Sequence, residues 1–107
     1  MIKYAKGVMA MYYVYMLRCE DNSLYTGITK DLERRFSEHL NSCKGAKYTK
    51  SHRPVKIASA FGVATKSEAL RLEYAIKSMK KSKKEMLVTN ELDINTVLGT
   101  EIKRISV

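Results

Sequence analysis

The sequence lacks any apolar run long enough to cross a bilayer, which takes about 18 consecutive apolar residues. It also lacks a secretory signal, because the apolar run at residues 8–11 is too short for a signal core and no cleavage-type sequence follows it. These two absences predict a cytoplasmic protein that has no membrane as a partner.

Cysteine is scarce as well, with Cys19 and Cys43 as the only two in 107 residues. Thiols in a cytoplasmic chain are usually small buried hydrophobic groups, so no disulfide is expected between them. No spacing of Cys and His resembles a zinc site. Internal repeats, low-complexity segments and linkers are also missing, and 45% of the residues are hydrophobic, which predicts one small globular domain.

Acidic residues are missing between Glu38 and Glu68, while the whole chain has a net charge of +9. Two basic clusters stand out: Lys44, Lys47, Lys50, Arg53, Lys56 and Lys66, then Lys77, Lys80, Lys81, Lys83 and Lys84. Such clusters are typical either of a solvated surface or of a surface that binds a polyanion. Because each cluster flanks one of the candidate site residues named below, a nucleic acid is the favoured partner.

A hairpin that leads directly into a helix is the clearest local pattern. Residues 12–19 and 24–28 are rich in β-branched and aromatic residues, and turn-forming residues separate them. Alternate residues of a strand share a face, and both sets in the first strand are apolar. We therefore expect both faces of that strand to be covered.

The helix after the hairpin has a clear start and a clear apolar face. Asp31 offers an N-cap oxygen. One stripe of the helix is apolar and predicted to be buried: Leu32, Phe36, Leu40 and Cys43. Arg35 and His39 lie one turn apart beside that stripe, so both should reach the same region of the fold.

A third strand and two further helices follow. Residues 55–63 predict a strand with one shared face: Val55, Ile57, Ser59 and Phe61. A capping box at residues 65–68 starts a helix with a buried stripe: Ala69, Leu72, Ile76 and Met79. A second capping box at residues 82–85 predicts a break near Ser82 and a short helix that ends at Val88.

The element order is therefore strand, strand, helix, strand, helix, helix. This order predicts an α+β fold in which a three-stranded antiparallel sheet is flanked by helices. Residues 1–10 are interpreted as an N-terminal extension, with a translation start at Met9 or Met11 as the alternative. Residues 11–88 are interpreted as the domain and residues 89–107 as a C-terminal tail.

A set of polar side chains could act together on a phosphodiester: Tyr15, Tyr25, Arg35, His39 and Glu73. A carboxylate can hold Mg²⁺, which often takes one or two carboxylates together with waters and substrate phosphate. An arginine suits phosphate oxygens, while phenols and imidazole can move a proton or orient water. Each also has an ordinary structural alternative. Glu73 could pair with Lys77, for example, and Arg35 with Glu38.

The loop-like stretch from residue 42 to residue 53 suits a nucleic-acid strand. Its basic residues could meet phosphates, and Tyr48 could stack on a base or anchor the loop to the core. Gly27 interrupts the second strand, which often marks a place where something approaches the backbone closely. The predicted nucleic-acid-binding residues are Gly27, Lys44, Lys47, Tyr48, Lys50 and Arg53.

Two short motifs stand on the hairpin strands: Y-V-Y at residues 13–15 and Y-T-G at residues 25–27. Arg35 follows the second motif by eight residues, and Glu73 lies in a later capped helix. In this combination, residues 12–88 resemble the GIY-YIG nuclease domain, and most closely its small single-domain bacterial members.

The resemblance implies a three-stranded antiparallel sheet flanked by helices and cleavage of DNA that depends on Mg²⁺ or Mn²⁺. It implies that Tyr15 positions or deprotonates water, that Arg35 stabilises the phosphate, and that Glu73 binds the metal. Tyr25 matches the second motif, and His39 matches a histidine found at that helical position in some members.

The chain departs from the family pattern at Tyr13, which stands where the first motif has glycine. Val14 and Thr26 replace isoleucines but keep a β-branched side chain. Much of the family chooses its cleavage sites with a separate DNA-recognition domain. This sequence is not expected to contain such a domain.

The residues and the resemblance together predict a metal-dependent endonuclease that hydrolyses DNA, with a role in DNA repair or recombination. One alternative is a nucleic-acid-binding module with little or no catalysis, and another is a small adaptor that docks on a repair or translation protein. DNA is the predicted partner, RNA would suit the same charges, and a monomer is favoured over an oligomer.

Overall fold

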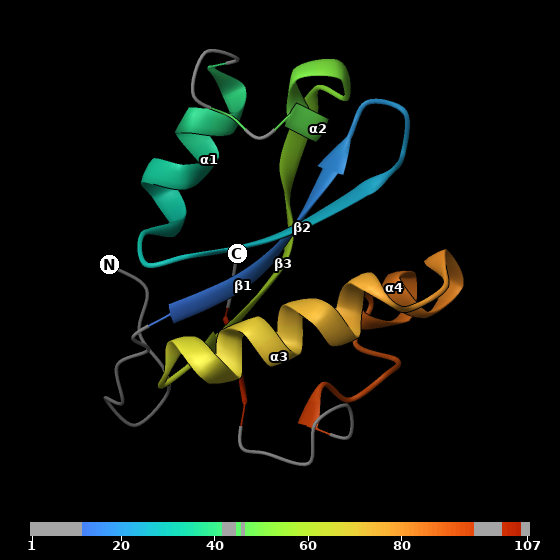
Figure 1. Cartoon of the computed structure of the whole chain (residues 1–107). Helices are drawn as coiled ribbons and strands as arrows, with labels where there is room; N and C mark the ends of the chain where they lie inside the picture. The colour runs from blue at the N-terminus through green and yellow to red at the C-terminus, as the bar shows by residue number, and fades with distance from the viewer. Residues whose placement is uncertain (1–11, 42–44, 46, 96–101, 106–107) are drawn as a thin grey trace.

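A single antiparallel sheet separates two helical layers. The computed structural model describes residues 12–41, 45, 47–95 and 102–105. Its elements are β1 (Tyr12–Cys19), β2 (Leu24–Thr29), α1 (Leu32–Leu40), α2 (Lys47–Ser51), β3 (Pro54–Val63), α3 (Lys66–Lys77), α4 (Lys81–Val88) and β4 (Lys103–Ile105). The sheet order is β2-β1-β3-β4, with α1 and α2 on one face and α3 and α4 on the other (Figure 1). The predicted α+β class is confirmed.

The strand β1 lies inside the sheet and is covered on both faces, as its sequence predicts. Tyr13, Tyr15 and Leu17 pack in the cluster that includes Leu32 of α1. The alternate residues Val14 and Met16 pack in the cluster formed with α3 and α4. Side chains from β1 can therefore reach toward the α1 layer or the α3 layer, according to their position in the strand.

Two predicted helix starts are confirmed. The Asp31 side chain accepts a hydrogen bond from the Arg34 amide at the start of α1. Thr65 and Glu68 form a capping box at the start of α3, and Ala69, Leu72 and Ile76 are buried beneath that helix. These caps fix where each helix begins and hence which residues face the sheet. Every helix in the described residues is too short or too polar to span a bilayer.

The predicted second capping box is wrong. The helix α4 begins at Lys81, its N-cap is Lys80, and no side chain caps it, so Ser82 lies inside the helix. The Met79 amide donates to the Ile76 carbonyl, which shows that the chain turns sooner after α3 than the sequence pattern indicates.

The sheet has four strands, so the predicted strand count of three is wrong. The extra strand is β4, which pairs with β3 and belongs to the segment interpreted as a tail. Ile105 in this strand and Ile102 just before it are buried, and Arg104 donates to the carbonyls of Leu87 and Val88 at 2.7 and 2.8 Å. A strand of three residues is too short to show a period of two, which is why the sequence pattern missed it.

Local irregularities overturn three smaller expectations. A register shift in the pairing of β1 with β3 places Ile57 and Phe61 in different core clusters, so they do not share a face. Leu40 is 45% exposed instead of buried, and Cys43 lies outside the described residues. The short helix α2 occupies part of the stretch expected to be a loop.

An ion pair between β1 and α4 gives a prediction about stability. Arg18 binds both carboxylate oxygens of Glu85, at 2.5 and 2.6 Å, and this contact lowers the pKa of Glu85 to about 2. Glu85→Gln should lower the free energy of unfolding at neutral pH by about 1 kcal/mol, because the pair is partly exposed. For a domain of this size, that corresponds to a melting temperature about 4 °C lower.

The pH dependence of this effect follows from the direction of the pKa shift. A carboxylate with a lowered pKa stabilises the fold above its ordinary pKa of 4.5, and the stabilisation is lost as the pH falls toward about 2. Thermal denaturation should therefore show that the melting temperatures of the wild type and of Glu85→Gln converge as the pH falls over this range. A difference in melting temperature that is independent of pH would contradict an electrostatic origin.

Candidate active site

The phenol of Tyr15 lies at the centre of the candidate site, directly over the backbone of the edge strand β2. Tyr15 and Gly27 are paired across β1 and β2. A Cβ atom at Gly27 would lie 2.6 Å from the Tyr15 hydroxyl oxygen and 2.8 Å from Cζ. A side chain at this position is therefore incompatible with the phenol, and the glycine allows Tyr15 to extend toward the open edge of the sheet.

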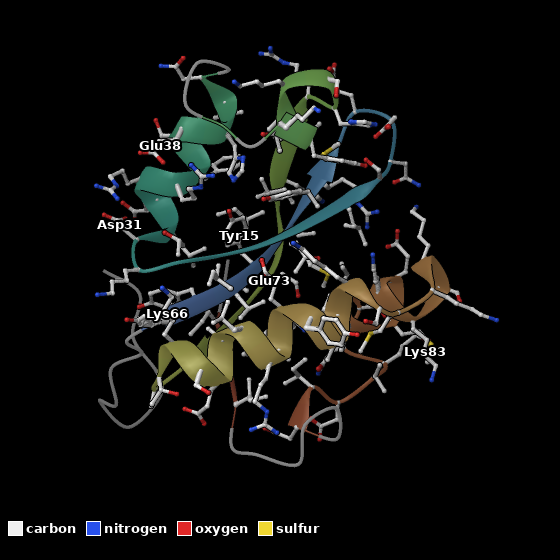
Figure 2. All side chains as sticks on the ribbon, in the orientation of Figure 1. Tyr15, Asp31, Glu38, Lys66, Glu73 and Lys83 are labelled. Carbon is white, nitrogen blue, oxygen red and sulfur yellow. The ribbon has the colours of Figure 1, made fainter. Side chains whose placement is uncertain are left out.

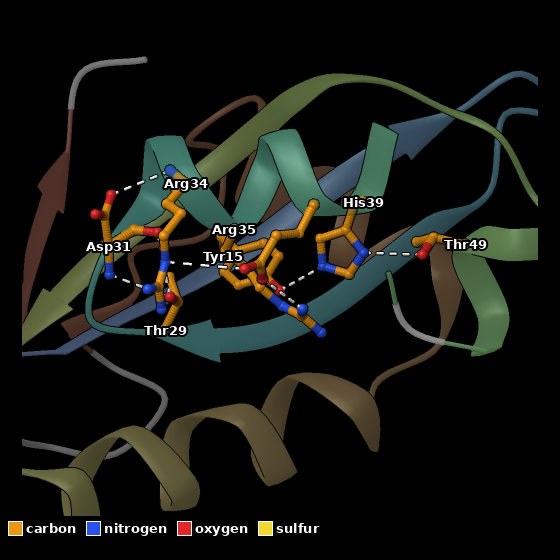
Figure 3. A network of polar contacts seen from close by, with 8 residues as sticks. Tyr15, Thr29, Asp31, Arg34, Arg35, His39 and Thr49 are labelled. Carbon is orange, nitrogen blue, oxygen red and sulfur yellow. Dashed lines mark hydrogen bonds and ion pairs between the residues drawn. The ribbon is translucent and has the colours of Figure 1, made fainter. Parts of the chain in front are cut away.

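A buried line of hydrogen bonds holds this phenol. The Tyr15 hydroxyl lies 2.7 Å from Nε2 of His39, and Nδ1 of His39 lies 2.8 Å from Oγ1 of Thr49 (Figure 3). The imidazole is only 1% exposed. Because both ring nitrogens have partners, the ring is fixed in one orientation.

The helical layer formed by α1 and α2 supplies the guanidinium of Arg35. Arg35 comes from the same helix as His39, one turn earlier, and its guanidinium opposes the rise in the pKa of the Tyr15 phenol. Its Nη1 atom also lies 2.9 Å from the Glu38 carboxylate. The ring of Tyr25 lies close by, with its centroid 6.3 Å from that of Tyr15 and 5.2 Å from that of His39.

The carboxylate of Glu73 comes from the other helical layer. Glu73 stands at the margin of the buried stripe of α3, and its side chain is 20% exposed. Figure 2 shows it projecting from α3 toward β2, with Tyr15 just beyond that strand. Its charge acts on the Tyr15 phenol, and Lys77 lies 3.4 Å from it. The two layers thus bring their functional groups together at the β2 edge.

The electrostatics of the site keep both Tyr15 and His39 neutral. Burial raises the pKa of Tyr15 to about 12, and Tyr25 and Glu73 add to the rise against the opposing effect of Arg35. Burial and the charge of Arg35 lower the pKa of His39 to about 4. At neutral pH the phenol therefore carries its proton and the imidazole has one nitrogen able to accept a proton.

The donor set at this edge limits the kind of metal that it could hold. In the part of the chain that the structure describes, no three His, Cys, Asp or Glu residues gather as a metal cage. Mg²⁺ does not need one, because it is usually held by one or two carboxylates together with waters and substrate phosphate. The partly exposed carboxylate of Glu73 fits that mode of binding.

The predicted nucleic-acid-binding residues are not all in one place. Gly27 lies inside the site, while Lys47, Lys50 and Arg53 are exposed on and after α2, and Lys44 lies outside the described residues. Tyr48 is stacked against His52, with ring centroids 3.9 Å apart, and against Tyr25 at 5.7 Å. These contacts favour the alternative in which Tyr48 anchors the loop.

Sequence reasoning missed Thr49, the residue that holds the far side of the His39 ring. The sequence offers one indication, which is the glycine at position 45, four residues before Thr49. A Cβ atom at Gly45 would lie 2.9 Å from Oγ1 of Thr49, so a residue without a side chain is needed there. The same atom would lie 3.1 Å from Cα of His39. The chain thus passes close to α1 here, which lets α2 place Thr49 next to the imidazole.

The fold and the site define a small α+β domain with a tyrosine, an arginine and a glutamate near the β2 edge of its sheet. The family model for the GIY-YIG catalytic domain matches residues 11–86 of the chain. The chain belongs to the GIY-YIG family, and the predicted family assignment is confirmed.

The following three relatives each cover three quarters or more of this chain. A UPF0213 protein of Fusobacterium nucleatum is 50% identical over 98 residues, which cover 88% of this chain and 97% of that protein. A UPF0213 protein of Staphylococcus haemolyticus is 48% identical over 80 residues, covering 75% of this chain and 96% of that protein. The solution NMR structure of a UPF0213 protein from Bacillus halodurans is 41% identical, covers 84% of this chain and 98% of that one, and has a TM-score of 0.49.

Proposed function

We propose that this protein is a metal-dependent endonuclease that hydrolyses phosphodiester bonds of DNA. The observation that carries the proposal is the meeting of Tyr15, Arg35 and Glu73 at one open edge of the sheet. Membership of the GIY-YIG family supports the same chemistry. The net charge of +9 suits a polyanionic substrate.

In this proposal, Tyr15 and His39 move the proton of the attacking water. The neutral imidazole of His39 can accept through Nε2, which lies 2.7 Å from the Tyr15 hydroxyl, so the phenol hydrogen is directed toward that nitrogen. As the water oxygen bonds to phosphorus, its proton passes to the Tyr15 oxygen and the phenol proton passes to Nε2. This coupled transfer avoids a free phenolate, which is rare at neutral pH because the pKa of Tyr15 is about 12.

The other residues bind and neutralise the phosphate. The guanidinium of Arg35 presents donors to phosphate oxygens, and its ion pair with the Glu38 carboxylate holds the guanidinium in place. Glu73 would hold Mg²⁺ or Mn²⁺, which when bound supplies Lewis-acid neutralisation of the phosphate and of the leaving oxygen. The bond from phosphorus to the leaving oxygen breaks, and that oxygen takes its proton from solvent.

The direct test is cleavage of labelled DNA by the wild-type protein. Supercoiled plasmid, duplex, single-stranded, flap and junction substrates would be incubated with Mg²⁺, with Mn²⁺ and with EDTA. We expect nicked or shortened products with either metal and none with EDTA. Binding that weakens with salt but gives no products with either metal would contradict the proposal and favour a binding module.

A further inference from the structure

The outer face of α3 carries an exposed aromatic side chain beside the candidate site. Tyr74 directly follows Glu73 and is 76% exposed, more than any other large hydrophobic side chain in the described residues. Leu70, one turn earlier, is 47% exposed. Single exposed apolar residues are ordinary on protein surfaces. This pair differs because it adjoins the carboxylate that faces Tyr15.

Basic residues border this pair on the same side of the helix. At about 100° per residue, Lys66, Leu70, Glu73, Tyr74 and Lys77 fall within about one third of the helix circumference. Lys66 and Lys77 are both exposed, and the helix rise places them about 16 Å apart, the length of several nucleotides. Figure 2 shows Lys66 and Glu73 leaving the helix on the side nearer to β2. This face therefore carries two lysines, with the exposed ring of Tyr74 at its border.

The ring of Tyr74 differs from the other aromatic rings near the site because it is exposed and is not stacked on another ring of the described residues. Tyr48 is stacked between neighbours, and the Tyr25 ring lies against those of Tyr15, His39 and Tyr48. Within residues 12–41, 45, 47–95 and 102–105, no aromatic ring or cation lies against Tyr74. Unpaired bases stack on exposed aromatic side chains, while basic residues nearby bind the phosphates of the strand.

We propose that the Tyr74 ring stacks on an unpaired base next to the phosphate that is cleaved, with Leu70 beside it and Lys66 and Lys77 on the flanking phosphates. This inference rests on the proposed nuclease function and gives it a substrate class: nucleic acid with unpaired nucleotides at the cleavage point. A base inside a continuous duplex has both faces covered by its neighbours and cannot stack on this ring.

A binding experiment tests this without relying on cleavage. The chain contains no tryptophan, so Tyr74→Trp introduces a single tryptophan, whose emission can be excited apart from that of the tyrosines, at the exposed position. In EDTA, we expect its emission to be quenched by a short oligothymidylate and to change little with a blunt duplex of the same length. Tyr74→Ser should weaken binding of the oligothymidylate about tenfold and binding of the duplex much less.

Met86→Gln is a matched control, since Met86 is exposed on α4 and its replacement should leave both affinities unchanged. Equal quenching by both nucleic acids, or equal loss of both affinities in Tyr74→Ser, would overturn the proposal. Self-association of the wild type that Tyr74→Ser abolishes would overturn it too, by assigning this face to a second copy of the chain. Selective quenching without cleavage of any substrate would uphold base stacking and reject the nuclease function, so the two failures are distinguishable.

Discussion

Glu73→Gln should reduce the cleavage rate about a thousandfold while leaving DNA binding nearly unchanged. The amide keeps the size of the side chain but removes the charge that would hold a divalent cation. A metal ion contributes several kcal/mol to such a reaction, and each factor of ten in rate corresponds to about 1.4 kcal/mol. Initial rates at saturating substrate, with affinities measured in EDTA, separate the two effects.

The fold should tolerate this change, because Glu73 is partly exposed and forms an ion pair with Lys77 on the surface. Glu33→Gln is the matched control, since Glu33 is an exposed carboxylate on α1 and its replacement alters the net charge equally. If both variants cleave at the wild-type rate, Glu73 does not hold the metal and the proposed site is wrong.

Gly27→Ala should lower cleavage about a hundredfold although it adds only a methyl group. The new Cβ atom would stand 2.6 Å from the Tyr15 hydroxyl oxygen, closer than such atoms can approach, so the phenol must move. Moving the phenol breaks its hydrogen bond with His39 and its alignment with the attacking water. Tyr15→Phe should show a loss of similar size, because it removes the same hydroxyl.

The neighbouring residue provides a control for Gly27→Ala on the same strand. The hydroxyl of Thr26 is buried without a hydrogen-bond partner among the described residues, so Thr26→Val should preserve both stability and cleavage. Thermal denaturation would verify that each variant is folded. Full cleavage by a folded Gly27→Ala protein would show that the position of the Tyr15 phenol is unimportant.

Much of the fold could be predicted because its signals are local. The hairpin follows from strand-forming residues around a turn, and α3 follows from its capping box. The strand β4 could not be predicted, because it is defined by pairing with β3 and not by its own pattern. The register shift between β1 and β3 is likewise a property of two strands together, so it reversed the face expected for Ile57.

Part of the candidate site could be predicted, because the spacing of the motifs along the sequence indicates which side chains lie near one another. The sequence and the family resemblance singled out Tyr15, Arg35 and Glu73, which the structure brings to one sheet edge. Thr49 escaped prediction because its importance depends on a contact with a ring from another helix. The stacking of Tyr48 on His52 depends on the formation of α2, which places the two rings one helical turn apart and which an apparently loop-like sequence did not indicate.

The candidate site contains residues from both sides of the edge strand β2, so it is complete only when the whole domain is folded. Tyr15 and Arg35 belong to one side of the sheet and Glu73 to the helix on the other side, so neither half is complete alone. A chain in which α3 has come away from the sheet would still present its phenol and guanidinium but would lack the carboxylate. Under the proposed function, partly unfolded or proteolytically trimmed copies should therefore leave DNA uncut, even where they still bind it.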